Sequence, residues 1–448
     1  MKEWKKVKIG DFLTEREGRY KPNDKKISKY QRLDKIDFSG HIHISNKPTK
    51  TDMIIVFPGD LVISGINVAK GAISVYQGKE PVCATIHYSS YTFDDKKVDL
   101  DYFKYFVKSP AFIFALQQQV KGGIKTEIKP KHLLPLEISL PDLSTQKEIV
   151  KVLSKKIEKV ELIKSEIESQ KNYAKLLRQN ILQEAIEGKL TEDWRKENPV
   201  VKGNPDFDAE ALFEKIQEEK CHTDSELLRN SKKKVFESIS ENEQPFEIPE
   251  GWKWVRLGEI VENITSGSRE WARYYSDTGA IFLRMGNLSR ESYVLRLDNI
   301  QHVRVPESSE GKRTRLLPFD LLFSITAEIG NLGLIPKDFP EAYINQHTAR
   351  IRFAQLVKQS LYFANALLAP GIRKLYLPNA HGMKNSFRLD TLSFIPLPLP
   401  PLAEQKEIVS RVEKLLTNVT ELEKQITKRE TLTKQMLQSI MKDAFREG

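Results

Sequence analysis

The chain has 448 residues, of which 40% are hydrophobic and 29% charged, a composition typical of a soluble protein with two or more domains. No stretch approaches the roughly 18 apolar residues of a membrane span, and the N-terminus lacks a signal-peptide core, so we expect a cytoplasmic protein with no membrane partner. The formal net charge of +10 favours nucleic acid as a partner, although many basic proteins bind none.

Residues 1–143 are predicted to form a first globular domain of mixed α and β structure. Alternating and apolar runs at Trp4–Phe12, Met53–Phe57 and Asp60–Ser64 indicate strands, and Pro/Gly/Asn clusters separate them. One helix is expected around Asp101–Val120, capped by Asp99 or Asp101.

A long helix is predicted next, within a helical spacer of residues 144–200. Its apolar residues step four and then three, as the a and d positions of a coiled coil do. These seam residues include Ile149, Leu153, Val160, Ile163, Ile167 and Ile181. Gly188 is expected to end the helix.

Residues 201–247 are predicted to be a linker. It contains an amphipathic helix at Ala209–Glu219, the basic run Lys232–Lys234, and a segment at Ser238–Gln244 that we expect to be disordered.

A second globular domain is predicted over residues 248–401, and it repeats the first. Trp252 matches Trp4, Pro318–Ser324 matches Pro58–Ser64, and Lys384 matches Lys125 in a glycine-containing loop. We interpret the Pro396–Pro401 run as a rigid join between this domain and the helix that follows.

Residues 402–448 are predicted to form a second helical spacer, a copy of the first at an offset of 259 residues that begins with Gln405 matching Gln146. Its seam includes Val412, Val419, Leu422, Ile426 and Ile440. We predict an antiparallel coiled coil in which Ile149, Val160, Ile163 and Ile167 pack on Val412, Val419, Leu422 and Ile426; the alternative is that each helix joins a separate bundle.

The seam turns polar once in each copy, at Gln170 and at Arg429. A polar layer of this kind can fix the register of a coiled coil. A helix of about 44 residues would be about 66 Å long, whereas DNA sites one turn apart are separated by about 34 Å.

The predicted strands and helices together give an α+β fold class, with two globular domains alternating with two long helices in an internal pseudo-twofold repeat.

Four segments in this order resemble the specificity subunit of a type I restriction–modification system. They are Leu140–Val150, Gly188–Pro199, Ile248–Ile260 and Leu397–Val409. The resemblance covers the whole chain and implies two target-recognition domains, each reading half of a split, asymmetric sequence in double-stranded DNA.

The resemblance also implies that the helices dock two methyltransferase subunits and that motor–nuclease subunits join for cleavage. S-adenosylmethionine is then expected on the methyltransferase, and ATP and magnesium on the motor–nuclease subunit. No cofactor, metal or catalytic residue is expected in this chain, which would not be an enzyme.

Motifs for catalysis are accordingly weak. The sequence has no phosphate-binding G-x-x-x-x-G-K-[ST] loop. The His41-x-His43 pair lacks a second metal-ligand cluster, and we interpret it as part of an exposed strand. Glu127-Ile128-Lys129 has the E-x-K form of a nuclease site, but its counterpart Ser386-Phe387-Arg388 would break such a site.

DNA contacts are predicted from side-chain chemistry, because Arg and Lys suit guanine, Asn and Gln suit adenine, and glycine permits close backbone approach. For the first domain these residues are Arg16, Arg19, Tyr20, Arg32 (aligned with Arg284), Asn67, Lys70, His87, Lys121, Lys125 and Thr126. For the second they are Ser266, Arg269, Arg273, Arg284, Asn287, Arg313, Arg315, Asn345, Gln346, His347, His381, Lys384 and Asn385. The alternatives in other functional classes are a coiled-coil scaffold with no DNA role and a free-standing nuclease.

Overall fold

The computed structural model describes residues 4–66, 72–119, 133–227, 236–267, 269, 271–305, 314–377 and 387–445. The chain divides into two compact units. Unit 1 comprises residues 1–170 and 425–448, and unit 2 comprises residues 171–424. Both boundaries fall inside the long helices, so each unit contains part of both.

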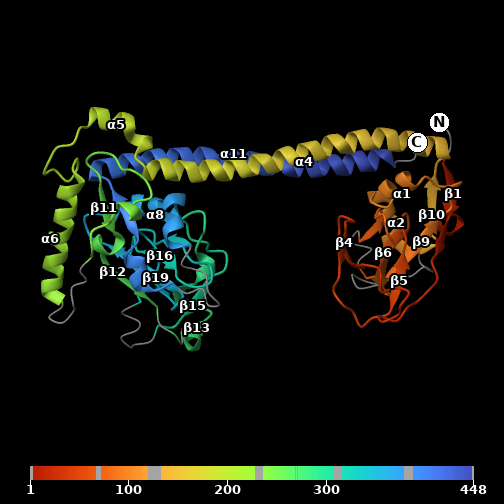
Figure 1. The fold of residues 1–448 in the computed structure, drawn as a ribbon, viewed down its shortest axis with the longest axis horizontal. Helices are drawn as coiled ribbons and strands as arrows, with labels where there is room; N and C mark the ends of the chain where they lie inside the picture. Colours follow the sequence, from red (N-terminus) through yellow and green to blue (C-terminus); the bar gives the residue numbers. More distant parts are fainter. Residues whose placement is uncertain are drawn as a thin grey trace. The chain divides into compact units, whose positions relative to one another are not determined.

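The described residues of unit 1 form two four-stranded sheets and one two-stranded sheet, and Figure 1 labels several of these strands. The sheet β2-β9-β6-β7 contains Leu13–Glu15, Tyr88–Phe93, Leu61–Ser64 and Ile73–Val75. The sheet β4-β3-β8-β5 contains Ile42–Ser45, Arg32–Ile36, Val82–Thr85 and Met53–Val56. Strands β1 (Lys5–Lys8) and β10 (Glu137–Leu140) form the antiparallel pair.

Unit 2 repeats this plan with an added helical segment. The sheet β12-β19-β16-β17 contains Val261–Ser266, Thr348–Phe353, Leu321–Ser324 and Leu332–Leu334. The sheet β13-β15-β14-β18 contains Tyr275–Ser276, Gln301–Val303, Ala280–Leu283 and Ala342–Ile344. Strands β11 (Lys253–Arg256) and β20 (Pro396–Leu399) pair, and the helices are α5 (Glu192–Glu197), α6 (Ala209–Leu227), α8 (Tyr362–Leu368), α9 (Pro370–Tyr376) and α10 (Leu389–Ser393).

The matched P-G-D and P-F-D strings are the same turn in the two units. Asp60 is buried and accepts from the Phe57 amide at 2.9 Å, while Asp320 is buried and accepts from the Leu317 amide at 2.7 Å. The residue before each aspartate has a left-handed backbone, with φ of +89° at Gly59 and +69° at Phe319. The sequence match therefore marks a fold element, and the aspartates hold it together from inside.

The single helix predicted for Asp101–Val120 is two helices. Helix α1 spans Leu100–Phe106 with Asp99 as its N-cap, and α2 spans Pro110–Gln119. Pro110 is the cause, because proline lacks the N–H that a helix interior needs and its ring clashes with the preceding turn, whereas it fits a helix start.

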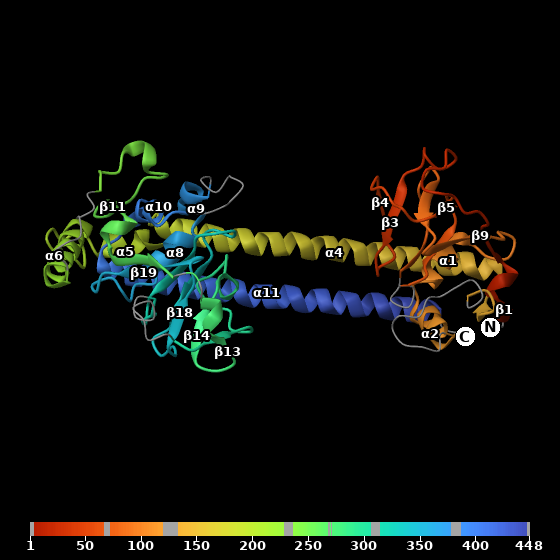
Figure 2. The ribbon, with the colours of Figure 1, turned by 90° about the horizontal axis from the view of Figure 1, so that it is seen from below.

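The long helices are α4 (Leu143–Ile186) and α11 (Leu402–Ala444), and they lie side by side within each unit (Figures 1 and 2). The repeated glutamine is buried and makes the same hydrogen bond at the start of each helix. Gln146 Nε2 donates to the Pro141 carbonyl and Gln405 Nε2 to the Pro400 carbonyl, both at 2.8 Å. Gly188, with φ of +72°, follows the end of α4 as predicted.

The coiled-coil seam has one fully buried residue in each heptad. In α4 this row is Leu153, Val160, Ile167, Ala174 and Ile181, and in α11 it contains Val412, Val419 and Ile426 before Thr433. The residues of the other predicted row are less buried. Ile149, Ile163 and Ile440 are half-buried, and Leu422 is 42% exposed, so its assignment to the buried seam is wrong.

The predicted antiparallel direction is confirmed, but the predicted partners are wrong. Leu153 shares a hydrophobic cluster with Met441 and Phe445, and Ile149 packs there with Ile440. In unit 2, Arg178 bonds Glu423 at 3.0 Å. The start of α4 therefore packs on the end of α11, since antiparallel pairing joins each residue to one near the opposite end of the other helix.

The two polar seam residues meet. Arg429 Nη1 donates to Gln170 Oε1 at 2.7 Å. These residues are also repeat counterparts, so each pairs with its own copy, which in an antiparallel pair happens only at the centre of symmetry. The interpretation of this polar layer as a register marker has a direct structural basis.

Three of the segments that carry the family resemblance meet at Glu404, which is buried in unit 2. Its carboxylate accepts from Thr191 Oγ1 at 2.7 Å, from Arg195 Nη1 at 2.5 Å and from Trp252 Nε1 at 2.7 Å. Glu404 and its partners come from three segments that lie far apart in the sequence. The residues that carry the family resemblance therefore form a structural junction in unit 2.

The linker is more ordered than the sequence predicts. Helix α6 extends to Leu227, although the helix was predicted to end at Glu219. The segment Ser238–Gln244, predicted to be disordered, contains a helical turn at Glu241–Glu243 capped by Ser240. Arg256 fixes this turn through a 2.8 Å ion pair with Glu243, a long-range contact that composition does not reveal. Lys232–Lys234 lies outside the described residues.

Among the helices that the structure describes, none has the length and apolar character needed to cross a membrane.

Candidate nucleic-acid interface

Several strands of unit 2 end at one edge, where they bring predicted contact residues together. Strands β14 and β18 are parallel neighbours (Figure 2), and Leu283 pairs with Ile344, so Arg284 and Asn345 follow at the same edge. The Gly267 amide, just after β12, donates to the Asn345 carbonyl at 3.1 Å. The Ile325 amide, just after β16, donates to the His347 carbonyl at 3.0 Å. We call Ser266, Arg284, Asn345, Gln346 and His347 the strand-end cluster.

A cavity of about 510 Å³ opens beside this cluster. It is lined by Arg284, Met285, Gly286, Asn287, Arg296, Asp298, Asn299, Asn345 and His347. Two guanidinium groups face one carboxylate here, so the cavity is rich in donors. The guanidinium of Arg284 makes no hydrogen bond or ion pair with a described residue.

The histidine of the cluster is fixed from both sides. Thr326 Oγ1 lies 2.9 Å from His347 Nδ1, and Gln346 Nε2 lies 2.8 Å from His347 Nε2. Because the amide nitrogen can only donate, Nε2 accepts and Nδ1 carries the proton toward Thr326. These two contacts fix the imidazole ring of His347 in the turn between β18 and β19.

Asn287 forms the frame of the cavity. It is buried, and its Oδ1 accepts from the Arg284 amide at 2.9 Å. Its Nδ2 donates to the carbonyls of Arg296 and Asn299 at 2.8 and 3.1 Å. All its polar groups are used within the chain, so Asn287 shapes the loop that presents Arg284 and has no free group for a base.

Other predicted residues of unit 2 lie elsewhere. Arg315 is next to Leu316, whose amide donates to the Ala342 carbonyl at the start of β18, whereas Asn345 follows the end of that strand. Arg273 stacks over Tyr274, 4.9 Å from the ring centre, close to β13. Arg269 is exposed. The structure does not join Arg273 or Arg315 to the strand-end cluster.

In unit 1 the turn between β8 and β9 is the counterpart of the histidine turn. The Gly65 amide donates to the His87 carbonyl at 2.9 Å, as Ile325 does to His347. Arg16 is held by Asp60 through two bonds of 2.6 and 2.9 Å, which ties it to the core. Tyr20 forms a β-bridge with Met53, and Arg19 is exposed next to the same segment.

The predicted alignment of Arg32 with Arg284 is wrong. Arg32 begins β3 and pairs with Cys83, whereas the matching residue of unit 2, Tyr343, pairs with Phe282. Arg32 is also occupied, by the Pro48 carbonyl at 3.1 Å and by Asp34 at 2.5 Å. That bond from Arg32 lowers the pKa of the Asp34 carboxyl. Arg32 therefore matches Phe282 at an offset of 250 residues, whereas a match with Arg284 requires an offset of 252.

Nine predicted contact residues lie outside the described residues. They are Asn67, Lys70, Lys121, Lys125, Thr126, Arg313, His381, Lys384 and Asn385. The Glu127–Lys129 triplet does so too. Phe387, which follows the matched glycine loop, donates its amide to the Ile325 carbonyl at 2.7 Å, so this flank is anchored beside the strand-end cluster.

No metal-binding group of three His, Cys, Asp or Glu side chains occurs among the described residues. His43 Nε2 lies 3.0 Å from Asp37 Oδ2. Hydrogen bonds from Ser39 and His43 hold the pKa of Asp37 well below its usual range. The histidine pair therefore takes part in the turn between β3 and β4.

Sequence reasoning missed Arg296, Asn299 and Thr326. Arg296 and Asn299 lie in the connection between β14 and β15, which is much longer than its counterpart between β3 and β4, so the sequence repeat gave no signal for them. No sequence pattern marks Thr326, and only the structure shows its contact with His347.

Comparison with known proteins gives a consistent result. The family model of the type I restriction modification DNA specificity domain matches residues 1–170 and 249–430. The chain is 26% identical over 404 residues to the EcoKI specificity subunit of Escherichia coli strain K12, covering 87% of this chain and 75% of that subunit. It is 28% identical over 281 residues to the EcoAI specificity subunit of Escherichia coli, covering 60% of this chain but only 44% of that subunit.

A solved structure is similar over nearly the whole length. It comes from work on complex assembly and conformational transition of the type I R-M system, with a TM-score of 0.64 and 17% sequence identity. The match covers 99% of this chain and 98% of that chain. At this identity the match supports the fold, which agrees with the predicted α+β architecture of globular domains alternating with long helices.

Proposed function

The chain belongs to the family of type I restriction modification DNA specificity domains, and from this premise we propose that it is the DNA-recognition subunit of a type I restriction–modification complex. Each unit would read one half of a split, asymmetric target. The paired helices would set the distance between the halves and dock methyltransferase subunits.

The observation that carries the proposal is the strand-end cluster of unit 2 with its adjoining cavity. Arg284 lies at the rim with its guanidinium unused by the described residues, and Asn345 lies beside it. Arginine can donate two parallel bonds to guanine, and asparagine can pair with adenine. Four strands and Asn287 fix the backbone under these groups, which is the preorganisation that base reading needs.

We propose that this chain is not itself catalytic and that its partners supply the chemistry. Two methyltransferase subunits would use S-adenosylmethionine to methylate adenine. Motor–nuclease subunits would use ATP and magnesium. The chain's part is to bind DNA, fix its register and present the target to these partners.

Two other functions make different predictions. A scaffold with no DNA role would show no salt-sensitive affinity for duplex DNA, whereas a reader loses affinity steeply as salt rises because phosphate contacts release counterions. A nuclease would cut DNA in a metal-dependent way, and cutting would be lost in Glu127→Ala.

The direct test is to co-express the chain with the methyltransferase encoded beside it and to map methylated adenines by single-molecule sequencing. A split, asymmetric motif is the expected result. A well-formed complex with no methylation and no salt-dependent DNA binding would refute the proposal that the chain recognises DNA and would favour the scaffold.

Arg284→Ala should weaken recognition of one half-site only. We expect a loss of about 1–3 kcal/mol in DNA binding and relaxed specificity at one position of that half, as for loss of a bidentate base contact. The measurement is the methylation motif of the variant complex, with a DNA-binding titration at fixed salt.

The matched control is Lys337→Ala. Lys337 is exposed in the turn before β18, at the end of that strand away from Asn345, and its loss removes the same charge. The control should keep the motif. Equal effects of both substitutions would show that only general charge matters and would contradict a base-reading role for Arg284.

A further inference from the structure

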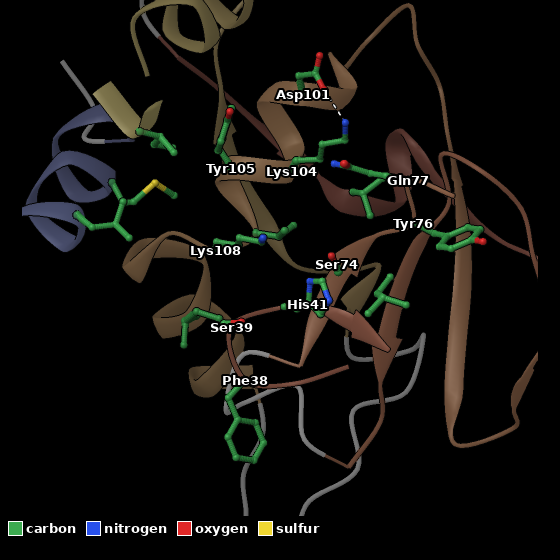
Figure 3. Close-up of a pocket in the computed structure, with 18 of the residues that line it drawn as sticks. Phe38, Ser39, His41, Ser74, Tyr76, Gln77, Asp101, Lys104, Tyr105 and Lys108 are labelled. Atoms are coloured by element: carbon green, nitrogen blue, oxygen red, sulfur yellow. Dashed lines mark hydrogen bonds and ion pairs between the residues drawn. The ribbon is translucent and has the colours of Figure 1, made fainter. Parts of the chain in front are cut away.

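A cavity of about 1330 Å³ in unit 1 is bounded by the edge strand β7, by helices α1 and α2, and by the long-helix pair. Figure 3 shows Ser74 and Tyr76 on the sheet side and Lys104, Tyr105 and Lys108 on the helix side. Its rim carries Phe114, which is 63% exposed, and Phe38, which is 60% exposed. Large aromatic side chains exposed around a hollow usually mark a binding surface.

The corresponding place in unit 2 is filled by the chain itself. Strands β7 and β17 are the edge strands of equivalent sheets. Ser289 and Leu332 exchange two backbone hydrogen bonds of 2.8 Å, and the Leu334 amide donates to the Tyr293 carbonyl at 2.7 Å. The segment 289–293 therefore pairs with the outer edge of β17.

Two further contacts hold this segment in unit 2. Helices α2 and α9 both begin with a proline, so Arg373 of α9 matches Ile113 of α2. Arg373 Nη1 donates to the Arg290 carbonyl at 2.7 Å. Tyr293 is half-buried, and burial and then the charge of Glu413 on α11 raise the pKa of its phenol. The segment thus bonds to the edge strand and to α9 and lies near α11, and the same three kinds of element surround the cavity of unit 1.

A difference in loop length explains why the described residues of unit 1 provide no such filling. The connection from β14 to β15 spans residues 284–300, whereas the equivalent connection from β3 to β4 spans only residues 37–41. This short turn reaches one end of β7, where a side chain on Gly40 would lie 2.8 Å from the Ile73 carbonyl oxygen. The outward backbone groups of Val75, the match of Leu334, have no backbone partner among the described residues.

The walls of the cavity indicate what would complement them. Lys108 makes no hydrogen bond or ion pair with a described residue; desolvation lowers the pKa of its ammonium group, and the charge of Asp37 acts in the opposite direction. Lys104 is paired with the exposed Asp101 at 2.7 Å (Figure 3). Apolar surface comes from Ile113, Phe114 and Ile157. An extended peptide with an apolar side chain and a carboxylate would satisfy the strand edge, the aromatic rim and Lys108 together.

We propose that this groove binds an extended segment of a methyltransferase subunit, which pairs with β7 as residues 289–293 pair with β17. The inference rests on the proposed function. One wall of the groove, with Ile157, Leu437 and Gln438, belongs to the helix pair that this function gives to the methyltransferase, so the two surfaces are continuous.

The test is photo-cross-linking in the complete complex of this chain with the methyltransferase encoded beside it. A photoreactive phenylalanine replaces Phe114, which is exposed and already aromatic. The matched control position is Lys374, its exposed counterpart on α9, where the groove is filled. We expect an adduct with the methyltransferase from position 114 and at most a weak one from position 374.

A charge reversal supplies the second measurement. Lys108→Glu should weaken assembly with the methyltransferase roughly tenfold, the factor that corresponds to 1.4 kcal/mol, while leaving DNA binding by the free chain unchanged. Lys374→Glu should change neither.

Three outcomes would overturn the inference. Equal adducts from both positions would show mere proximity, an adduct with a second copy of this chain would identify a different occupant, and no adduct in a complex that methylates DNA would leave the groove empty. Failure of the chain to bind the methyltransferase at all would defeat the proposed function first, and this inference with it.

Discussion

Deleting one heptad from each long helix should shorten the non-specific spacer of the DNA target and leave both half-sites unchanged. The deletion removes residues 167–173 of α4 and residues 426–432 of α11, which include the paired Gln170 and Arg429. Seven helical residues span about 10 Å, which is about three base pairs at 3.4 Å each. Comparison of methylation motifs between the variant and unaltered complexes measures the change.

The paired deletion is chosen because it preserves the seam. Val160 and Ala174 become neighbours in the buried row at the original spacing of seven, and in α11 Val419 is followed by Thr433 in the same way. Deleting residues 167–173 alone is the control. It should destabilise the chain, since the partners beyond the deletion no longer face one another. An altered half-site with an unchanged spacer would show that the helices do not measure the distance.

Glu404→Ala should destabilise unit 2 by about 3–5 kcal/mol, the usual cost of removing one partner from a buried ion pair. The substitution leaves the Arg195 guanidinium, the Trp252 indole N–H and the Thr191 hydroxyl without their shared acceptor. The midpoint of urea unfolding, followed by tryptophan fluorescence, measures the effect.

The control for this substitution is Glu407→Ala, one turn along the same helix. Glu407 also pairs with an arginine, Arg411, at 2.6 Å, but both side chains are partly exposed. Pairs of that kind contribute less than about 1 kcal/mol. Similar midpoints for Glu404→Ala and the unaltered chain would mean that the three-segment junction does not stabilise the fold.

The long helices show how much structure the sequence alone predicts. Their existence, length, antiparallel direction and polar layer follow from a periodic pattern that occurs twice, because helix geometry converts spacing into a face. The same pattern misplaced the partners of Ile149 and Val160. Periodicity identifies which face is apolar, whereas the position of one helix along the other depends on contacts such as those of Leu153 with Met441 and Phe445.

The recognition residues show what the sequence alone could not predict. The sequence identified Arg284, Asn345 and His347 by their chemistry, and the structure brings them to one edge. It could not separate Arg284 from Asn287, whose amide is used entirely within the chain, or from Arg16, which is bound by Asp60. A side chain's availability depends on its three-dimensional neighbours.

Taken by itself, the sequence determined the duplicated plan, the family and the helical spacer, because repeats, composition and periodicity are properties of the order of residues. Only the tertiary structure decided which polar groups hold the fold and which remain free to bind. It also showed that a twelve-residue difference between two equivalent connections gives the outer edge of β17 a partner segment, whereas the outer edge of β7 has none among the residues that the structure describes. Hydrogen-bond partners and cavities arise from residues far apart in the chain, and no local pattern records which of them meet.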